Sequence, residues 1–197
     1  MSQFKDWLNR TFNGKKIEML GLKDAGKTQF LKSLGCKEAN PEVESQTEKY
    51  NWFKVSYPEK EVYVKASYDS GGGREIFTEI FNKRIKSSDW ILFIIDIEKY
   101  LHGGTDEESN ESYQQQVNDR LYYINKHTPE HYNNKIAIVL SHADLVPQPS
   151  GELINNFQRM THEKAFKVLT KHCYSLDARD EKAVLNCFKR ITGICKT

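Results

Sequence analysis

The chain has 197 residues, of which 38% are hydrophobic and 28% are charged, a composition typical of one globular domain and unlike that of disordered chains. Its 29 Lys and Arg residues nearly balance its 27 Asp and Glu residues, so the net charge of +2 provides no general attraction for nucleic acid. We therefore expect no nucleic-acid partner, and any anion must be bound at a local site.

Apolar periodicity and clusters of β-branched residues divide the chain into alternating helices and strands. In chain order, we expect an amphipathic helix at 3–13, a strand at 16–20, a helix around 30–34, two hairpin strands at 52–57 and 61–68, a helix around 76–81, a strand at 90–95, an exposed loop at 102–112, a helix at 113–126, a strand at 135–140, a helix at 151–169, a short strand near 172–176 and a helix at 181–194. This order predicts an α/β fold with a mostly parallel six-stranded sheet, one antiparallel hairpin strand, and helices on both faces. Residues 1–14 are assigned to an N-terminal helix and residues 15–197 to the main domain.

A candidate phosphate-binding loop lies between the first predicted strand and the next helix. Residues 21–28 read GLKDAGKT and satisfy the pattern GxxxxGK[ST]. Gly21 and Gly26 allow backbone N–H groups to face phosphate oxygens, Lys27 can reach the terminal phosphates as a catalytic cation, and Thr28 can offer its hydroxyl to Mg²⁺. The same segment supplies four more nucleotide-binding candidates, which are Lys23, Asp24, Ala25 and Gln29.

Two further motifs indicate which base is bound. Residues 69–72 read DSGG at the end of a hairpin strand, where Asp69 can hold Mg²⁺ through water and the Gly72 N–H can sense the γ-phosphate. The strand at 135–140 is followed by the sequence SHAD, which ends in Asp144. A carboxylate accepts hydrogen bonds only, and guanine offers two donors on one edge that adenine does not offer in that arrangement. The combination favours GTP over ATP.

With these motifs in this order, nearly the whole chain resembles a small GTPase of the group that includes ADP-ribosylation factors and the signal-recognition-particle receptor β subunit. The family's WDxGG motif is similar to residues 68–72, its NKxD motif to residues 141–144, and its SAK element to residues 177–179. The resemblance implies a P-loop NTPase G domain that binds GTP or GDP with Mg²⁺. It also implies that Ala178 and Arg179 contact the base through the backbone.

The chain departs from the family at its predicted switch segments. The family threonine that completes the Mg²⁺ shell is best matched by Thr47, for which an ordinary loop threonine is the alternative interpretation. Gly73 stands where the family has a glutamine that orients the attacking water, so hydrolysis should be slow. Arg74 and Lys23 are candidates to stabilise charge on the γ-phosphate, although an arginine on a surface loop is more often simply solvated.

The predicted base loop also differs from the family. Ser141 and His142 replace an asparagine and a lysine. Loss of the amide removes a group that usually links the base loop to the phosphate loop, so a lower nucleotide affinity is expected. The imidazole of His142 can still stack on guanine, and Ser141 is expected to be a weaker contact.

Residues 1–14 carry two open interpretations, weak contact with a membrane surface or packing on the domain. Ser2 in place of glycine excludes myristoylation, and the position of Cys195 does not form a prenylation box. The longest apolar run, residues 90–95, is far shorter than the roughly 20 residues of a membrane-spanning helix. We expect a cytoplasmic protein, peripheral at a membrane if the N-terminal helix binds lipid.

The cysteine spacing and one histidine motif argue against a disulfide framework and a zinc site. The four cysteines, at positions 36, 173, 187 and 195, have no paired CxxC spacing, so we expect reduced thiols and neither a zinc site nor a disulfide framework. Residues 127–131 match the HxxEH pattern of some zinc peptidases, but Pro129 opposes the regular helix that this site requires. A surface loop is the better interpretation.

The sequence as a whole predicts a GTP-binding molecular switch with slow hydrolysis, which presents a nucleotide-dependent surface to a protein effector or regulator. The first alternative is a GTP-binding interaction module with little or no turnover, which the absent glutamine at position 73 keeps open. The second alternative is an ATP-dependent phosphotransferase, for which no acceptor site is evident in the sequence.

Overall fold

The structure is a computed structural model, and it describes residues 14–37, 39, 47–49, 52–58, 61–69, 78, 81–103, 111–129, 135–161 and 172–193. The predicted helix at 3–13, most of the predicted loop at 102–112 and the second half of the predicted helix at 151–169 lie outside these ranges. Residues 1–13 of the predicted separate N-terminal helix thus lie outside the described residues.

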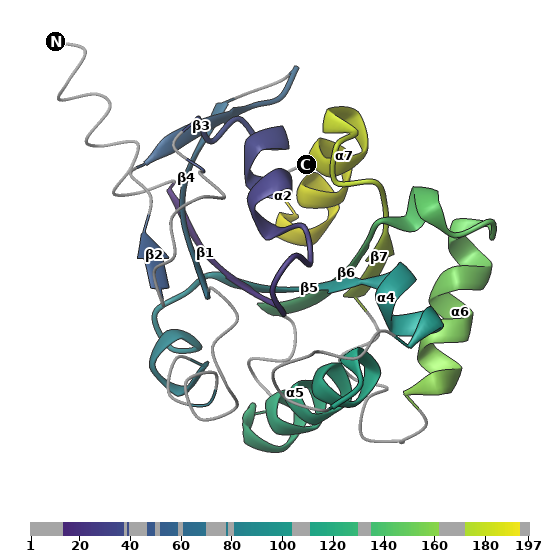
Figure 1. The fold of residues 1–197 in the computed structure, drawn as a ribbon. Helices are drawn as coiled ribbons and strands as arrows, with labels where there is room; N and C mark the ends of the chain where they lie inside the picture. Colours follow the sequence, from purple (N-terminus) through teal and green to yellow (C-terminus); the bar gives the residue numbers. More distant parts are fainter. Residues whose placement is uncertain are drawn as a thin grey trace, which may run out of the picture.

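A central sheet organises the chain (Figure 1). Its strands are β1 (Lys15–Leu20), β2 (Thr47–Lys49), β3 (Phe53–Ser56), β4 (Glu61–Asp69), β5 (Trp90–Asp96), β6 (Ile136–Ser141) and β7 (Cys173–Ser175). The strand order is β2-β4-β1-β5-β6-β7, with β3 also paired to β4. β2 and β3 pair with opposite ends of β4 and are antiparallel to it, whereas all other pairs are parallel. The predicted mostly parallel sheet with an antiparallel hairpin is confirmed, but it has seven strands and not six, because β2 is a second antiparallel strand that the sequence did not predict.

Helices connect the strands and cover both faces. They are α2 (Lys27–Ser33), α4 (Ile97–His102), α5 (Tyr113–His127), the 3-10 turn η2 (Ala143–Leu145), α6 (Ser150–Met160) and α7 (Glu181–Thr192), and residues 81–84 are also helical. In Figure 1, α2 and α7 lie on one side of the sheet and α5 on the other. α4 was not predicted, and because it reaches His102 the predicted loop begins one residue later, at Gly103.

The continuous apolar runs explain why the sheet is covered twice. In β5, every residue from Ile91 to Asp96 is buried, and all six residues of β6 are buried. A strand buried on both faces needs apolar partners above and below it. Phe30 of α2 and Phe188 of α7 belong to the core on one face, and Phe157 of α6 belongs to the core on the other.

The helix ends follow recognisable capping chemistry. The Ser112 side chain accepts a hydrogen bond from Gln115 N at the start of α5, and Asp180 accepts one from Ala183 N at the start of α7. α7 ends at Gly193 in a left-handed conformation, which glycine adopts without a steric penalty. These caps satisfy backbone groups that a helix leaves unpaired at its ends.

A buried ion pair joins the helix at 81–84 to the sheet. Glu18 of β1 is fully buried, accepts a hydrogen bond from the Ser67 hydroxyl of β4, and lies 3.6 Å from Arg84 Nη1. A buried charge is tolerated when it is paired and hydrogen-bonded. The pair therefore fixes this helix against β1 and β4.

The cysteines of the described part of the chain form no disulfide. Cys36 and Cys187 are buried, and Cys173 is half-buried. Burial raises the pKa of the Cys173 thiol to about 12 and that of the Cys187 thiol to about 12. Among the same described residues, no helix is both long and apolar enough to cross a bilayer.

Candidate functional site

The predicted site residues follow the carboxyl ends of parallel strands. The phosphate-loop segment 21–28 follows β1, residues 141–144 begin at the end of β6, and residues 177–179 follow β7. β5 pairs in parallel with β1 on one side and β6 on the other, and β6 pairs in parallel with β7, so the carboxyl ends of these strands meet at one edge of the sheet. This edge is where open α/β sheets bind ligands.

The phosphate loop turns tightly at three positive backbone angles. Gly21 has φ +148°, and a Cβ at this position would lie 2.3 Å from the Ile94 carbonyl oxygen of β5. Asp24 has φ +59° and Gly26 has φ +90°, so the backbone changes direction twice more before α2 begins. Left-handed residues in such a turn let successive N–H groups point inward, which creates a concave site for an anion. The local geometry fits phosphate.

The lysine of the loop is folded back over it. Lys27 is buried, and its Nζ donates to Gly21 O at 2.6 Å and to Leu22 O at 2.8 Å. The loop carbonyls therefore hold a positive charge against the turn. Thr28 and Gln29 are half-buried in the first turn of α2, where no side chain of the described residues caps the helix. The remaining candidates differ in exposure, with Lys23 and Asp24 exposed and Ala25 buried.

Ser141 connects the base loop to the phosphate loop. Its side chain is fully buried, and Oγ lies 2.7 Å from Ala25 O and 3.0 Å from Ile95 O. The expectation that replacing the family asparagine removes this link differs from the structure, because a hydroxyl is long enough to reach a carbonyl that lies this close. Gly26 lies beside this link: an added Cβ would be in van der Waals contact with Ser141 Cβ at 3.4 Å, and its φ of +90° is the feature that favours glycine here.

His142 pairs with a carboxylate that the sequence analysis did not select. Its Nδ1 lies 3.0 Å from Asp96 Oδ2, within ion-pair distance. The nearby Asp96 carboxylate raises the pKa of His142 above its ordinary value of 6.5. Burial raises the pKa of Asp96, but His142 and the Lys99 N–H outweigh it, so this pKa lies below 3.8. The imidazole is thus charged more readily than a free histidine.

Asp96 occupies a position that the sequence marks only indirectly. It ends the apolar strand β5, and its side chain accepts from Lys99 N to cap α4. Its own N–H donates to the Tyr113 hydroxyl at 2.9 Å. A carboxylate directly after a buried strand is a signal for a functional edge, and the cap explains why α4 begins there.

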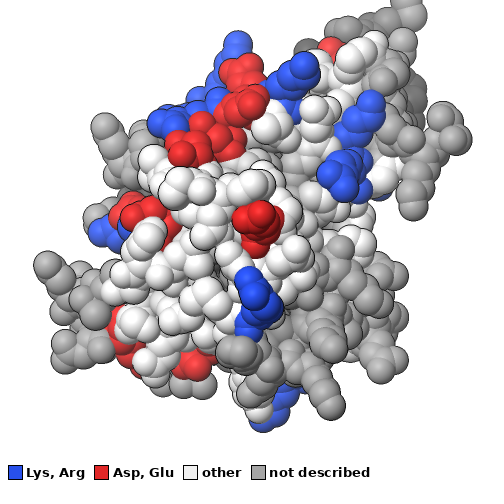
Figure 2. Space-filling view, turned by 90° about the vertical axis from the view of Figure 1, so that its right-hand side faces the viewer, with Lys and Arg blue, Asp and Glu red and all other residues white. Residues whose placement is uncertain are grey.

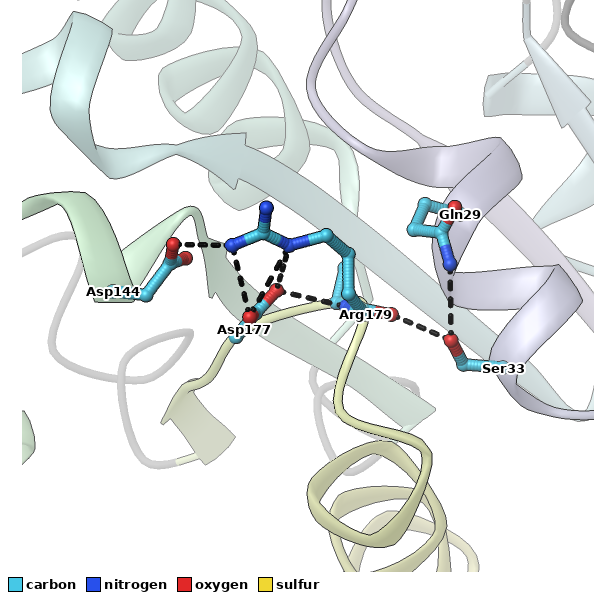
Figure 3. A network of polar contacts seen from close by, with 6 residues as sticks. Gln29, Ser33, Asp144, Asp177 and Arg179 are labelled. Atoms are coloured by element: carbon cyan, nitrogen blue, oxygen red, sulfur yellow. Dashed lines mark hydrogen bonds and ion pairs between the residues drawn. The ribbon is translucent and has the colours of Figure 1, made fainter.

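Asp144 is held by an arginine from the next loop (Figure 3). Arg179 Nη2 lies 2.5 Å from Asp144 Oδ2, while Arg179 Nε and Nη2 contact the two Asp177 oxygens at 3.0 and 3.1 Å. Arg179 N also donates to Asp177 Oδ1 at 2.8 Å. The Arg179 guanidinium lowers the pKa of Asp177 below its usual range. The structure therefore brings together Asp144 and Arg179, two of the predicted base contacts.

The loop that carries Arg179 is fixed to α2. Ser33 Oγ donates to Ala178 O at 2.7 Å, and Gln29 Nε2 donates to Ser33 Oγ at 3.3 Å (Figure 3). Ala178 itself is buried. Because α2 begins at the phosphate loop, this contact chain places the 177–179 loop in a defined position relative to it.

The predicted magnesium and switch residues are only partly described. Thr47 lies in strand β2 and not in a loop, and it is the register partner of Asp69 at the end of β4. Tyr68 of β4 is level with Met19 of β1, so Asp69 follows at the same edge as the phosphate loop. The side chains of Thr47 and Asp69 lie outside the described part. Gly72, Gly73 and Arg74 lie outside it entirely.

Other candidate sites contribute nothing to this edge. α5 ends at His127, whose ring stacks on Tyr123 with centroids 4.2 Å apart, so no regular helix continues through Pro129 as the zinc-peptidase pattern requires. No group of three or more His, Cys, Asp or Glu side chains in the described ranges could hold a metal ion.

Figure 2 shows charges of both signs among uncharged side chains on one face.

Comparisons with known proteins are informative at the level of structure alone. No protein-family model matches the chain, and no curated protein matches its sequence. Among solved structures, it is similar to the Arl6 BBS3 small GTPase from Trypanosoma brucei with bound nucleotide analogue GppNp, with a TM-score of 0.58, 15% identity, and coverage of 92% of this chain and 96% of that one. The fold is that of a small P-loop GTPase.

A second structure supports the same fold. The probable GTP-binding protein engB has a TM-score of 0.57 and 12% identity, and the match covers 91% of this chain and 99% of that one. Both likenesses extend over almost the full length of each chain. The expected G-domain fold, similar to that of an Arf-like protein, is therefore confirmed.

Proposed function

We propose that this GTPase fold binds GTP and GDP with Mg²⁺ and that its guanine preference comes from Asp144. The observation that carries the proposal is the 2.7 Å contact between Ser141 Oγ and Ala25 O, which joins the phosphate loop to the segment that bears Asp144. A tight glycine turn and a carboxylate-bearing loop at one sheet edge suit the two ends of a guanine nucleotide. The GppNp-bound structural neighbour supports the same ligand class.

Each group has a defined task in this proposal. Loop N–H groups and Lys27 bind the phosphates, and the Thr28 hydroxyl and Asp69, the latter through water, hold Mg²⁺. When bound, Mg²⁺ supplies positive charge that offsets the charge of the phosphate oxygens. Ala178, on the loop after β7, and the His142 ring, on the same loop as Asp144, are proposed to contact the base.

The base preference is tested by changing the acceptor at position 144. We expect Asp144→Asn to weaken GDP binding by about tenfold to a hundredfold, because an amide cannot accept both guanine donors. The same variant should gain affinity for xanthosine diphosphate, whose second ring carbonyl can accept from the amide N–H. Calorimetry measures the affinities of the variant and the unmodified protein for GDP and for xanthosine diphosphate. Equal GDP affinity in the variant and the unmodified protein would contradict the proposal.

We further propose slow hydrolysis of GTP and a surface near residues 47–49 and 71–75 that responds to the bound nucleotide and meets a protein partner. Gly73 favours one competing function, an interaction module that binds GTP without turnover. Single-turnover phosphate release separates them, because a switch should release phosphate in an Mg²⁺-dependent manner that Lys27→Ala abolishes. No release above buffer over several hours would favour the module.

Residues 1–14 are proposed to act at a membrane surface of a cytoplasmic protein, with packing on the domain as the alternative. Phe4, Trp7, Leu8 and Phe12 supply the apolar face for either role. Cosedimentation with anionic vesicles, with and without Trp7→Ser, tests the membrane role. Binding that is unaffected by nucleotide and by the substitution would argue against it.

A further inference from the structure

Arg179 contacts the Asp144 carboxylate, which the proposed function assigns to guanine as its hydrogen-bond acceptor. Its Nη2 lies 2.5 Å from Asp144 Oδ2, although the two residues are 35 positions apart in the sequence. We propose that Arg179 competes with guanine for Asp144, so that it must move off this carboxylate before a guanine nucleotide can bind. This inference rests on the proposed guanine-binding role of Asp144.

The chemistry of the two donors is closely matched. Guanine presents N1–H and the 2-amino group on one N–C–N edge, and a guanidinium presents pairs of N–H donors on the same N–C–N unit. Guanine and the guanidinium group can therefore each donate two parallel hydrogen bonds to one carboxylate, with a similar spacing between the two N–H donors. Asp144 cannot serve both donors fully, because its side chain is only 28% exposed and one oxygen already accepts from Nη2.

Arg179 is held in the competing position by a second carboxylate. Asp177 receives Nε at 3.0 Å and Nη2 at 3.1 Å, and Figure 3 shows the guanidinium lying between Asp177 and Asp144. Asp177 is a neighbour in the same loop, so it orients the side chain without a long-range rearrangement. The arginine thus reaches Asp144 in a preferred geometry.

The side chain can leave while the loop stays in place. The Arg179 side chain is 65% exposed, so its departure disturbs no core packing. The loop backbone is fixed to α2 through the contact between Ser33 Oγ and Ala178 O. Movement is therefore confined to side-chain rotation, and the apparent nucleotide affinity is reduced by the fraction of molecules in which Asp144 is occupied.

The test compares Arg179→Ala with the unmodified protein by calorimetry, using GDP and ADP in the presence of Mg²⁺. We expect the variant to bind GDP about two- to fivefold more tightly, the range expected when one exposed ion pair is removed. ADP binding should not change, because adenine does not offer the pair of N–H donors that guanine offers to the Asp144 carboxylate. Arg190→Ala is the matched control, since it removes an equal charge from α7, where Arg190 lies over Tyr174. It should change neither affinity.

The outcomes separate this inference from the proposed function. Unchanged or weaker GDP binding by Arg179→Ala would overturn the competition, and so would an equal change for GDP and ADP. A lack of guanine preference in the unmodified protein would instead defeat the proposed function. Thermal unfolding of both variants confirms that they are folded, because neither substitution removes a buried side chain.

Discussion

Replacing Ser141 with alanine tests whether the link between the two loops contributes to stability. The hydroxyl is fully buried and contacts Ala25 O and Ile95 O, so its loss leaves a carbonyl in the interior without this donor. Such a loss costs about 1–3 kcal/mol. We expect the free energy of unfolding to fall by about 1–2 kcal/mol, which lowers the Tm by about 2–4 °C for each kcal/mol in a domain of this size.

Ser175 provides a matched control for this substitution. It lies on β7 and is the register partner of Leu140, the residue before Ser141. Its Oγ is also buried but has no hydrogen-bond partner within the described ranges, so Ser175→Ala should be neutral or slightly stabilising. Urea unfolding and GDP calorimetry measure both variants. Equal unfolding free energies for the two variants would refute the reasoning.

Two further changes follow from the same edge of the sheet. Gly21→Ala places a Cβ 2.3 Å from Ile94 O at φ +148° and should destabilise the fold by about 2–4 kcal/mol, whereas Gly151→Ala, with open space around it, should be within about 0.5 kcal/mol of the unmodified protein; chemical denaturation compares them. The pair of His142 and Asp96 predicts a pH dependence. Because the pKa of His142 is raised on folding, its contribution is complete below 6.5 and is lost as the pH rises through the folded value. The contribution of Asp96, whose pKa is lowered, is lost only in acid. Unfolding free energy should therefore decline as the pH rises above about 6.5, the ordinary pKa of histidine, and His142→Gln should remove that decline; a decline that persists in the variant would show that another group is responsible.

The sequence predicted most of the sheet because its signals are local. The apolar runs at 90–95 and 135–140 identify buried strands by themselves, and the GxxxxGKT pattern defines the turn between β1 and α2. α4 was missed because six residues are too few to establish a helical period. Its Asp96 cap and the glycine after His102 were nevertheless visible as boundary signals.

The candidate site was predicted less completely because its contacts join distant segments. Ser141 and Ala25 are 116 positions apart, and no local pattern shows that the serine hydroxyl reaches that carbonyl. The choice of Asp144 required only the motif, whereas its pairing with Arg179 depends on how β6 and β7 are aligned. Residue types therefore suggested the chemistry, and tertiary packing determined which groups meet.

The burial of the cysteines has a practical consequence for spectroscopy. With their pKa values near 12, the Cys173 and Cys187 thiols stay protonated at neutral pH, and a protonated thiol is a poor nucleophile toward maleimide dyes. Cys36 is buried as well, so a cysteine introduced at exposed Gly151 should be labelled selectively once Cys195 has been changed to serine.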